Sequence, residues 1–230
     1  LAVRGDFDDC QALVKAMFNH HAFRDETGLS GVNSINWARI VAQVVYYFTA
    51  AVSLGAPGRP VAFSVPTGNF GDVLAGWVAK RMGLPVALLN VATNANDILA
   101  RTLASGRYEA TGVVPTTSPS MDIQVSSNFE RALFEAGGRD AGAIRTMMAS
   151  LAQSRAFTIA DASLATLRRD FAASAVGEDA VAAEMQATWR DAGYLLDPHT
   201  AIGLASGRAA LARDPAVPMV ALGTAHPAKF

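Results

Sequence analysis

A chain of 230 residues is long enough to bury one full α/β core. Hydrophobic residues make up 51% of it and charged residues 17%, which excludes an intrinsically disordered chain. The net charge of −1 excludes the broad basic surface of a nucleic-acid-binding protein, and no apolar run of about 18 residues is present to span a membrane. The single cysteine, Cys10, cannot form an internal disulfide, which favours a reducing compartment such as the cytoplasm.

Helical patterns dominate the first part of the chain. A longer helix is predicted over 35–54, and because it is apolar almost throughout we expect it to be mostly buried. The sequence starts at Leu1, without a methionine and within a strand-to-helix junction, so we expect it to be part of a longer protein. Before that helix, a short strand at 1–3 leads into a helix with an apolar stripe at helical spacing, made of Leu13, Val14, Met17 and Phe18.

The middle of the chain carries the pattern of a βαβ unit. Buried strands are predicted over 61–66 and 86–91, and a helix over 73–82 lies between them. A strand, a glycine-rich loop, a helix and a second strand within about 30 residues imply parallel pairing and a right-handed crossover.

The remainder is rich in helices and ends with a strand at 219–222. Glu130 follows Ser127 by three residues, the spacing of a capping box at a helix start. The alternation of strands and helices predicts an α/β fold. Helices are predicted over 95–104, 128–136, 141–150, 160–173, 178–191 and 200–211.

The glycine-rich loop at 66–72 is the strongest candidate for a binding site. A turn between a buried strand and a helix directs several backbone N–H groups, and the helix dipole, at one point. Gly68 and Gly71 permit a backbone approach that a Cβ would block. Their spacing matches neither the nucleoside-triphosphate nor the dinucleotide pattern. The alternative is a tight turn without a ligand, in which Asn69 and Asp72 are turn and capping residues.

Two further polar groups suit an anionic ligand. Thr224 stands at the carboxyl end of the last strand, where open α/β sheets bind ligands, although its hydroxyl can also bond its own backbone. Asn33, Asn36 and Arg39 are about one turn apart and can face one side of a helix start. The alternative is helix capping by Asn33 and its neighbour Ser34, plus a surface arginine.

The histidines give no catalytic or metal signal. His199 and His226 each stand beside a proline, in settings typical of turns. His20 and His21 diverge on a helix end and lack a cysteine or acidic cluster, so no metal site is predicted.

Six motifs occur along the chain in a characteristic order: 5–11, 33–36, 66–72, 127–131, 197–201 and 223–230. In this order they resemble the threonine synthase family, and they cover essentially the whole chain. The resemblance implies a type II pyridoxal-phosphate fold, with a three-layer, open, mostly parallel sheet. It also implies that residues 1–27 finish the smaller domain of such an enzyme and that 28–230 form most of the larger one.

The family resemblance also implies functional roles. Members convert O-phospho-L-homoserine and water to L-threonine and phosphate with pyridoxal 5'-phosphate. Gly68, Asn69, Phe70 and Gly71 then hold the cofactor phosphate, and Thr224 faces the pyridine nitrogen. Contacts of Asn33, Asn36 and Arg39 with the substrate are also expected.

The family's reaction needs a Schiff-base lysine. The chain contains only Lys15, Lys80 and Lys229, and none matches the family's position. We therefore expect no catalytic residue in this chain, an upstream lysine, and no activity of the chain alone. Two alternatives stay open: a serine/threonine dehydratase of the same fold, or a non-catalytic phosphate-binding α/β module.

Overall fold

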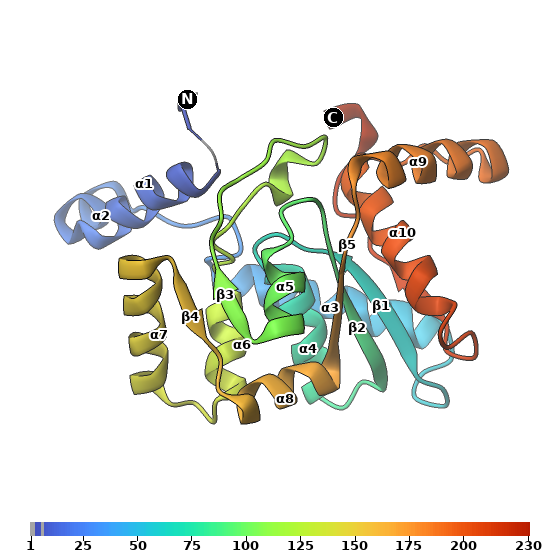
Figure 1. Ribbon diagram of the computed structural model, residues 1–230, viewed down its shortest axis with the longest axis horizontal. Helices are drawn as coiled ribbons and strands as arrows, with labels where there is room; N and C mark the ends of the chain where they lie inside the picture. The colour runs from blue at the N-terminus through green and yellow to red at the C-terminus, as the bar shows by residue number, and fades with distance from the viewer. Residues whose placement is uncertain (1–2, 6) are drawn as a thin grey trace.

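The computed structural model describes residues 3–5 and 7–230, which fold around a four-stranded sheet (Figure 1). The strand order is β5-β2-β1-β6, and all three pairings are parallel. This sheet confirms the predicted α/β class. The short strand expected at 1–3 lies mostly outside the described residues. The strands are β1 (Val61–Pro66), β2 (Val86–Thr93), β5 (Phe171–Ala175) and β6 (Met219–Ala221).

Successive residues of β1 point to opposite faces of the sheet, and helices pack on both faces. On one face, the Phe63 ring lies 4.7 Å from the Tyr47 ring of α3 (Trp37–Ser53), which packs with α4 (Gly71–Arg81). On the other face lies α10 (Pro198–Leu211), so close that a Cβ on Gly203 would come within 2.8 Å of the Pro66 ring. Helix, sheet and helix form three layers, and the predicted βαβ unit is β1, α4 and β2.

Helix α3 differs from its prediction in two ways. It buries only the face of Ile40, Val44, Tyr47 and Ala51, whereas Val45 on another face is 60% exposed. The expectation of a mostly buried helix was therefore wrong, because an apolar sequence does not show how many faces find a partner. The helix is capped by Asn36, whose Oδ1 accepts a hydrogen bond from Ala38 N at 3.0 Å, and not by Asn33 or Ser34.

The predicted helix over 160–173 is also wrong at its end. Helix α8 (Asp161–Asp170) stops at Asp170, and β5 begins at the next residue. Phe171 inserts its ring into the core, with centroid distances of 5.3 Å to Phe70 and 5.5 Å to Trp77. The rest of β5 is alanine and serine, which carry no strand signal, so tertiary pairing with β2 decides its conformation.

A smaller unit packs beside the sheet. An antiparallel pair, β3 (Arg107–Glu109) and β4 (Ala156–Thr158), escaped prediction because each strand has three residues. Asn128 caps α6 without a side-chain bond and Glu130 is exposed, so the capping box with Ser127 is not formed. The helices of this unit are α5 (Ile98–Ser105), α6 (Phe129–Ala136), α7 (Ala141–Ser154) and α8.

The amino-terminal helices extend to one side of the molecule (Figure 1). They are α1 (Phe7–Asn19) and the unpredicted α2 (His21–Thr27). Gln11 of α1 is buried and donates from Nε2 to Asn69 Oδ1 at 3.0 Å, which ties this helix to the glycine-rich loop. Helix α9 (Glu178–Ala192) and the short turns η1 (Pro119–Met121) and η2 (Pro227–Lys229) complete the fold. No helix in the described part of the chain is long and apolar enough to cross a membrane.

Candidate functional site

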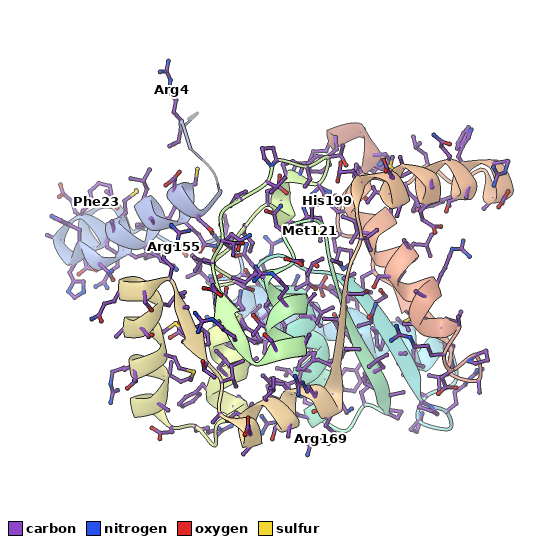
Figure 2. The ribbon with its side chains drawn as sticks, in the orientation of Figure 1. Arg4, Phe23, Met121, Arg155, Arg169 and His199 are labelled. Atoms are coloured by element: carbon purple, nitrogen blue, oxygen red, sulfur yellow. The ribbon has the colours of Figure 1, made fainter. Side chains whose placement is uncertain are left out.

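A cavity of about 880 Å³ opens beyond the carboxyl ends of β1 and β6. This is the edge of a parallel sheet where loops converge and ligands bind. The glycine-rich loop 66–72, the segment 33–34 with Arg39, and the segment 222–225 line it together. Met121 and His199, which also line it, lie above the sheet in Figure 2. The cavity thus unites most of the polar groups selected from the sequence.

The glycine-rich loop offers backbone where a side chain has no room. A Cβ on Gly68 would lie 3.1 Å from Ser120 O, and a Cβ on Gly71 would lie 2.7 Å from Ser34 Cβ. Close packing therefore requires a glycine at 71, and at 68 the backbone of Ser120 would have to shift by a few tenths of an ångström to admit a Cβ. Helix α4 begins at Gly71, so its amino-terminal N–H groups and dipole lie at the cavity. This arrangement suits an anion such as a phosphate.

Phe70 and Asn69 contribute backbone and one free donor. Phe70 has a left-handed backbone (φ 61°), and its buried ring lies 5.2 Å from the Phe129 ring, so the ring belongs to the core. The side-chain Oδ1 of Asn69 accepts from Gln11 Nε2 at 3.0 Å and from Ser127 Oγ at 3.3 Å. Its Nδ2 bonds no other described residue, which leaves this nitrogen free to donate.

Thr224 follows β6 and lines the same cavity as an exposed residue. Its hydroxyl bonds no backbone group in the described ranges 3–5 and 7–230. The hydroxyl can therefore serve a ligand that also reaches the glycine-rich loop.

The three polar residues near the start of α3, namely Asn33, Asn36 and Arg39, do not all lie at the cavity. Asn33 and Arg39 line the cavity, whereas Asn36 does not: it caps α3 and donates from Nδ2 to Gly31 O at 2.8 Å. Both ends of the Asn36 amide are used in the turn, and its contact with the substrate stays a prediction. Asn33 accepts from Ile35 N at 3.1 Å through Oδ1, and Arg39 donates from Nη1 to Val32 O at 3.1 Å.

Asp72 is neither a turn residue nor a cap. Its Oδ1 accepts from Tyr46 Oη at 2.5 Å and from Tyr47 Oη at 2.9 Å, both on α3. Burial raises the pKa of Asp72, and the two hydroxyl donors oppose that rise. The cluster joins α3 to the start of α4 at the cavity wall. Two adjacent tyrosines in an apolar helix were the one signal of it in the sequence.

His199 is a buried part of the cavity wall, so its interpretation as a simple turn residue was wrong. Its Nδ1 lies 2.9 Å from Asp197 Oδ1, and its Nε2 accepts from Ser120 N at 3.3 Å. These partners place the proton on Nδ1. Burial lowers the pKa of His199, which keeps the ring neutral despite Asp197. Its partner Ser120 is 79 residues away, beyond the reach of local pattern.

A buried carboxylate fixes the segment that carries Ser120 and Met121. Asp122 Oδ1 accepts from Asn94 Nδ2 at 2.7 Å, from Asn96 Nδ2 at 2.8 Å and from Thr116 Oγ1 at 2.6 Å. Ser120 O and Met121 Cα are the backbone atoms nearest to the Cβ position of Gly68. Sequence analysis missed this network, since its members are spread over the connections around α5.

The three lysines of the sequence, all described, lie in different places. Only Lys229 lines the cavity, and its Nζ lies 5.3 Å from the Phe230 ring centroid. Lys80 pairs with Asp170 at 2.9 Å, near the end of α4 remote from the glycine-rich loop. Lys15 lines a different cavity, described below.

Sequence comparisons identify close relatives. A family model described as threonine synthase, C-terminal, matches residues 200–230. Threonine synthase of Pseudomonas aeruginosa is 51% identical over the whole chain, which covers 49% of that relative. Threonine synthase of Saccharomyces cerevisiae is 40% identical, again over the whole chain and 48% of the relative.

Solved structures agree with these relatives. A PLP-bound threonine synthase from Brucella melitensis superposes with a TM-score of 0.89 at 60% identity, over the whole chain and 49% of that structure. Threonine synthase from yeast superposes with a TM-score of 0.86 at 38% identity, over 48% of its length. A threonine deaminase at 15% identity, with a TM-score of 0.58, shares the fold alone. The chain is therefore similar over its whole length to threonine synthases, has the type II pyridoxal-phosphate fold, and spans about half the length of the relatives that it matches.

Proposed function

We propose that the chain is the carboxyl-terminal portion of a threonine synthase, which converts O-phospho-L-homoserine and water to L-threonine and phosphate. The observation that carries the proposal is one cavity lined by the glycine-rich loop, a helix amino terminus and a threonine hydroxyl that bonds no backbone group of the described residues. The whole-chain similarity to threonine synthases supports it.

Pyridoxal 5'-phosphate is the proposed cofactor, and the residues present fit it. The backbone of Gly68, Asn69, Phe70 and Gly71, which lines the cavity at the start of α4, would hold its phosphate. The dipole of α4 contributes about 0.3–1 kcal/mol, and up to ~2 kcal/mol in a partly buried site. Thr224 would bond the pyridine nitrogen. When bound, the group acts as an electron sink, and a neutral hydroxyl makes that sink milder than a carboxylate would.

The substrate phosphate is proposed to bind beside the cofactor cradle. Asn33 and Arg39 line that part of the cavity. Asn33 Oδ1 is used by Ile35 N, but Asn33 Nδ2 bonds no residue of the described ranges and can donate to the phosphate. The exposed Arg39 guanidinium adds a positive charge. A neutral amide and a cation match a phosphate monoester.

We propose that the Schiff-base lysine comes from the half of the relatives that this chain does not span. Lys15 and Lys80 lie outside the cavity, and Lys229 belongs to the turn η2 at its rim. In the proposed enzyme, residues 1–27 complete the smaller domain and 28–230 form most of the larger one. The chain alone is then inactive. Its single cysteine favours the cytoplasm as the location of the enzyme.

Turnover by the full-length protein tests the proposal. We expect inorganic phosphate to be released from O-phospho-L-homoserine in step with L-threonine. Efficient deamination of serine or threonine without phosphate release would instead identify a dehydratase of the same fold. Binding of pyridoxal phosphate without either turnover would favour a non-catalytic phosphate-binding module.

A further inference from the structure

Arg131 of α6 is a half-buried cation whose hydrogen-bond partners are all neutral. Its Nη1 donates to Asn128 Oδ1 at 2.6 Å and to Ser34 O at 3.2 Å, and its Nη2 donates to Ile35 O at 2.9 Å. The guanidinium also lies over the Trp37 ring, 5.6 Å from the centroid. It forms no ion pair with a carboxylate of the described chain. Burial lowers the pKa of Arg131, which expresses the cost of keeping this charge out of water.

Asn128 connects Arg131 to the glycine-rich loop through hydrogen bonds. This buried residue donates to Asn69 O twice, from its backbone N at 3.0 Å and from Nδ2 at 3.1 Å. The same Nδ2 donates to Ser34 Oγ at 2.9 Å. Asn128 thus bonds both sides of the contact between Gly71 and Ser34, where a Cβ on Gly71 would lie 2.7 Å from Ser34 Cβ.

Arg131 and Asn128 together tie segment 33–36 to the glycine-rich loop. Arg131 fixes the carbonyls that follow Asn33, and Asn128 fixes the carbonyl of Asn69. Asn33 and Asn69 both line the candidate cavity, whereas Arg131 lines a second cavity of about 850 Å³. Any effect of Arg131 on a ligand in the candidate site therefore acts through other residues.

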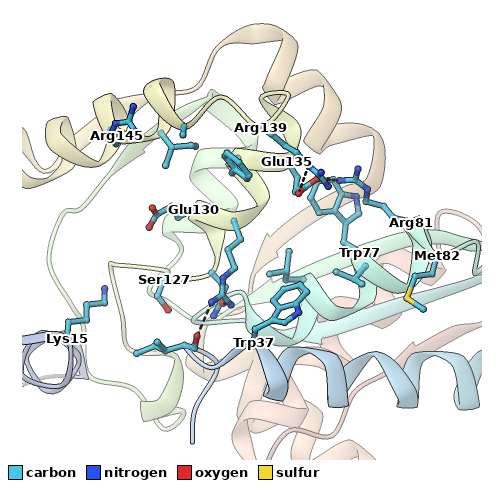
Figure 3. A pocket seen from close by; sticks show the side chains of 18 residues that line it. Lys15, Trp37, Trp77, Arg81, Met82, Ser127, Glu130, Glu135, Arg139 and Arg145 are labelled. Carbon is cyan, nitrogen blue, oxygen red and sulfur yellow. Dashed lines mark hydrogen bonds and ion pairs between the residues drawn. The ribbon is translucent and has the colours of Figure 1, made fainter. Parts of the chain in front are cut away.

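The second cavity provides a matched arginine for comparison. In Figure 3, Trp37 and Trp77 lie in its wall, and Glu135 bonds both Arg81 and Arg139. Arg139 Nε lies 3.0 Å from Glu135 Oε1, and its side chain is 67% exposed. It has the same charge as Arg131 on the same cavity, but its bond leads to α6 and not to the candidate site.

We propose that Arg131 is a positioning residue that, through Asn128, holds segment 33–36 and the glycine-rich loop in the arrangement that binds the substrate phosphate. The inference rests on the proposed function. A guanidinium suits this position because it donates to the three acceptors from two nitrogens held in one rigid plane, whereas an ammonium donates from a single nitrogen on a flexible stem. Arg131 and Asn128 then act as one unit, and losing either releases both segments.

The test uses the full-length protein loaded with pyridoxal phosphate. Four variants are compared with the wild type: Arg131→Met, Asn128→Ala, the double variant and the control Arg139→Met. Calorimetry measures the Kd of inorganic phosphate, and steady-state kinetics measure KM and kcat for O-phospho-L-homoserine. We expect Arg131→Met to raise Kd and KM by about tenfold, with a smaller change in kcat. An effect of this size is comparable to that of one charge-assisted hydrogen bond.

The remaining variants separate positioning from general stability. The double variant should bind phosphate no more weakly than the weaker-binding single variant, since the two residues form one unit. Arg139→Met should change Kd by less than about twofold, because its ion pair is exposed. If Arg131→Met does not fold, Arg131→Lys, which keeps the charge, replaces it in the comparison. We expect Arg131→Lys to bind phosphate more weakly than the wild type.

Two results would overturn the inference. One is a variant of Arg131 that melts earlier but binds phosphate with wild-type affinity. The other is additive loss of affinity in the double variant. The proposed function fails separately, if the wild-type enzyme releases no phosphate from O-phospho-L-homoserine. In that case the calorimetric comparison still reports whether Arg131 organises an anion site.

Discussion

Of the glycines that line the candidate cavity, Gly71 has the least room for a Cβ. A Cβ there would lie 2.7 Å from Ser34 Cβ, so Gly71→Ala must push segment 33–34 away from the glycine-rich loop. We expect the affinity of the full-length protein for pyridoxal phosphate to fall by about tenfold or more, and stability to fall by about 1–3 kcal/mol. Cofactor titration and thermal unfolding measure the two effects.

Gly177 provides the control for this substitution. A Cβ at this glycine meets nothing within 4 Å, and the residue lies outside the cavity. Gly177→Ala should leave the cofactor affinity unchanged. Wild-type cofactor affinity in Gly71→Ala would contradict the assignment of the loop as the phosphate cradle.

His199 should make stability depend on pH. Burial lowers its pKa in the folded state, so below about pH 6.5 the unfolded chain binds more protons than the folded one. The stability that neutral His199 contributes is present above its unfolded pKa and is lost as pH falls below it. We expect the unfolding midpoint of the full-length protein to drop more between pH 7 and pH 5 than that of His199→Asn. Equal slopes in the two proteins would contradict this account.

At the scale of elements, the sequence pattern predicted the helices and strands whose conformation depends mainly on neighbouring residues. The strands β1 and β2 and the helix α4 were predicted because each has a run of apolar residues bounded by glycine or proline. Strand β5 was not, because Ala172, Ala173 and Ser174 form a strand only beside β2. In the candidate site, the glycine-rich loop and Thr224 could be selected from local sequence. The roles of His199 and Arg131 could not, since their partners are 79 and about 97 residues away.

The connection that carries Ser120 should depend on one carboxylate. Asp122 Oδ1 receives three donors and Oδ2 receives Thr116 N at 2.9 Å, so Asp122→Asn turns one acceptor into a donor that faces other donors. We expect a loss of about 1–3 kcal/mol in stability and faster hydrogen exchange over 114–122. Asp97→Asn, which removes a partly exposed pair with Arg101, should cost less than about 1 kcal/mol. A similar loss from both substitutions would contradict the special role of Asp122.

At the scale of the whole molecule, the candidate cavity gathers segments from most of the chain length. It is lined by residues between Asn33 and Phe230, which the parallel sheet brings to one edge. The chain supplies backbone for a phosphate, a hydroxyl and a cationic side chain at this edge. Lys229 is the one lysine of the described chain that lines it.

Covalent labelling can show whether any of these lysines forms the Schiff base. Borohydride reduction of the full-length protein with bound pyridoxal phosphate, followed by peptide mass spectrometry, identifies the lysine that carries the cofactor. We expect the label on a lysine outside this chain, because Lys15 and Lys80 lie outside the cavity and the Lys229 ammonium lies against Phe230. Lys229→Met should be labelled as fully as the wild type. A label on Lys229, or its loss in Lys229→Met, would show that the chain carries its own covalent anchor.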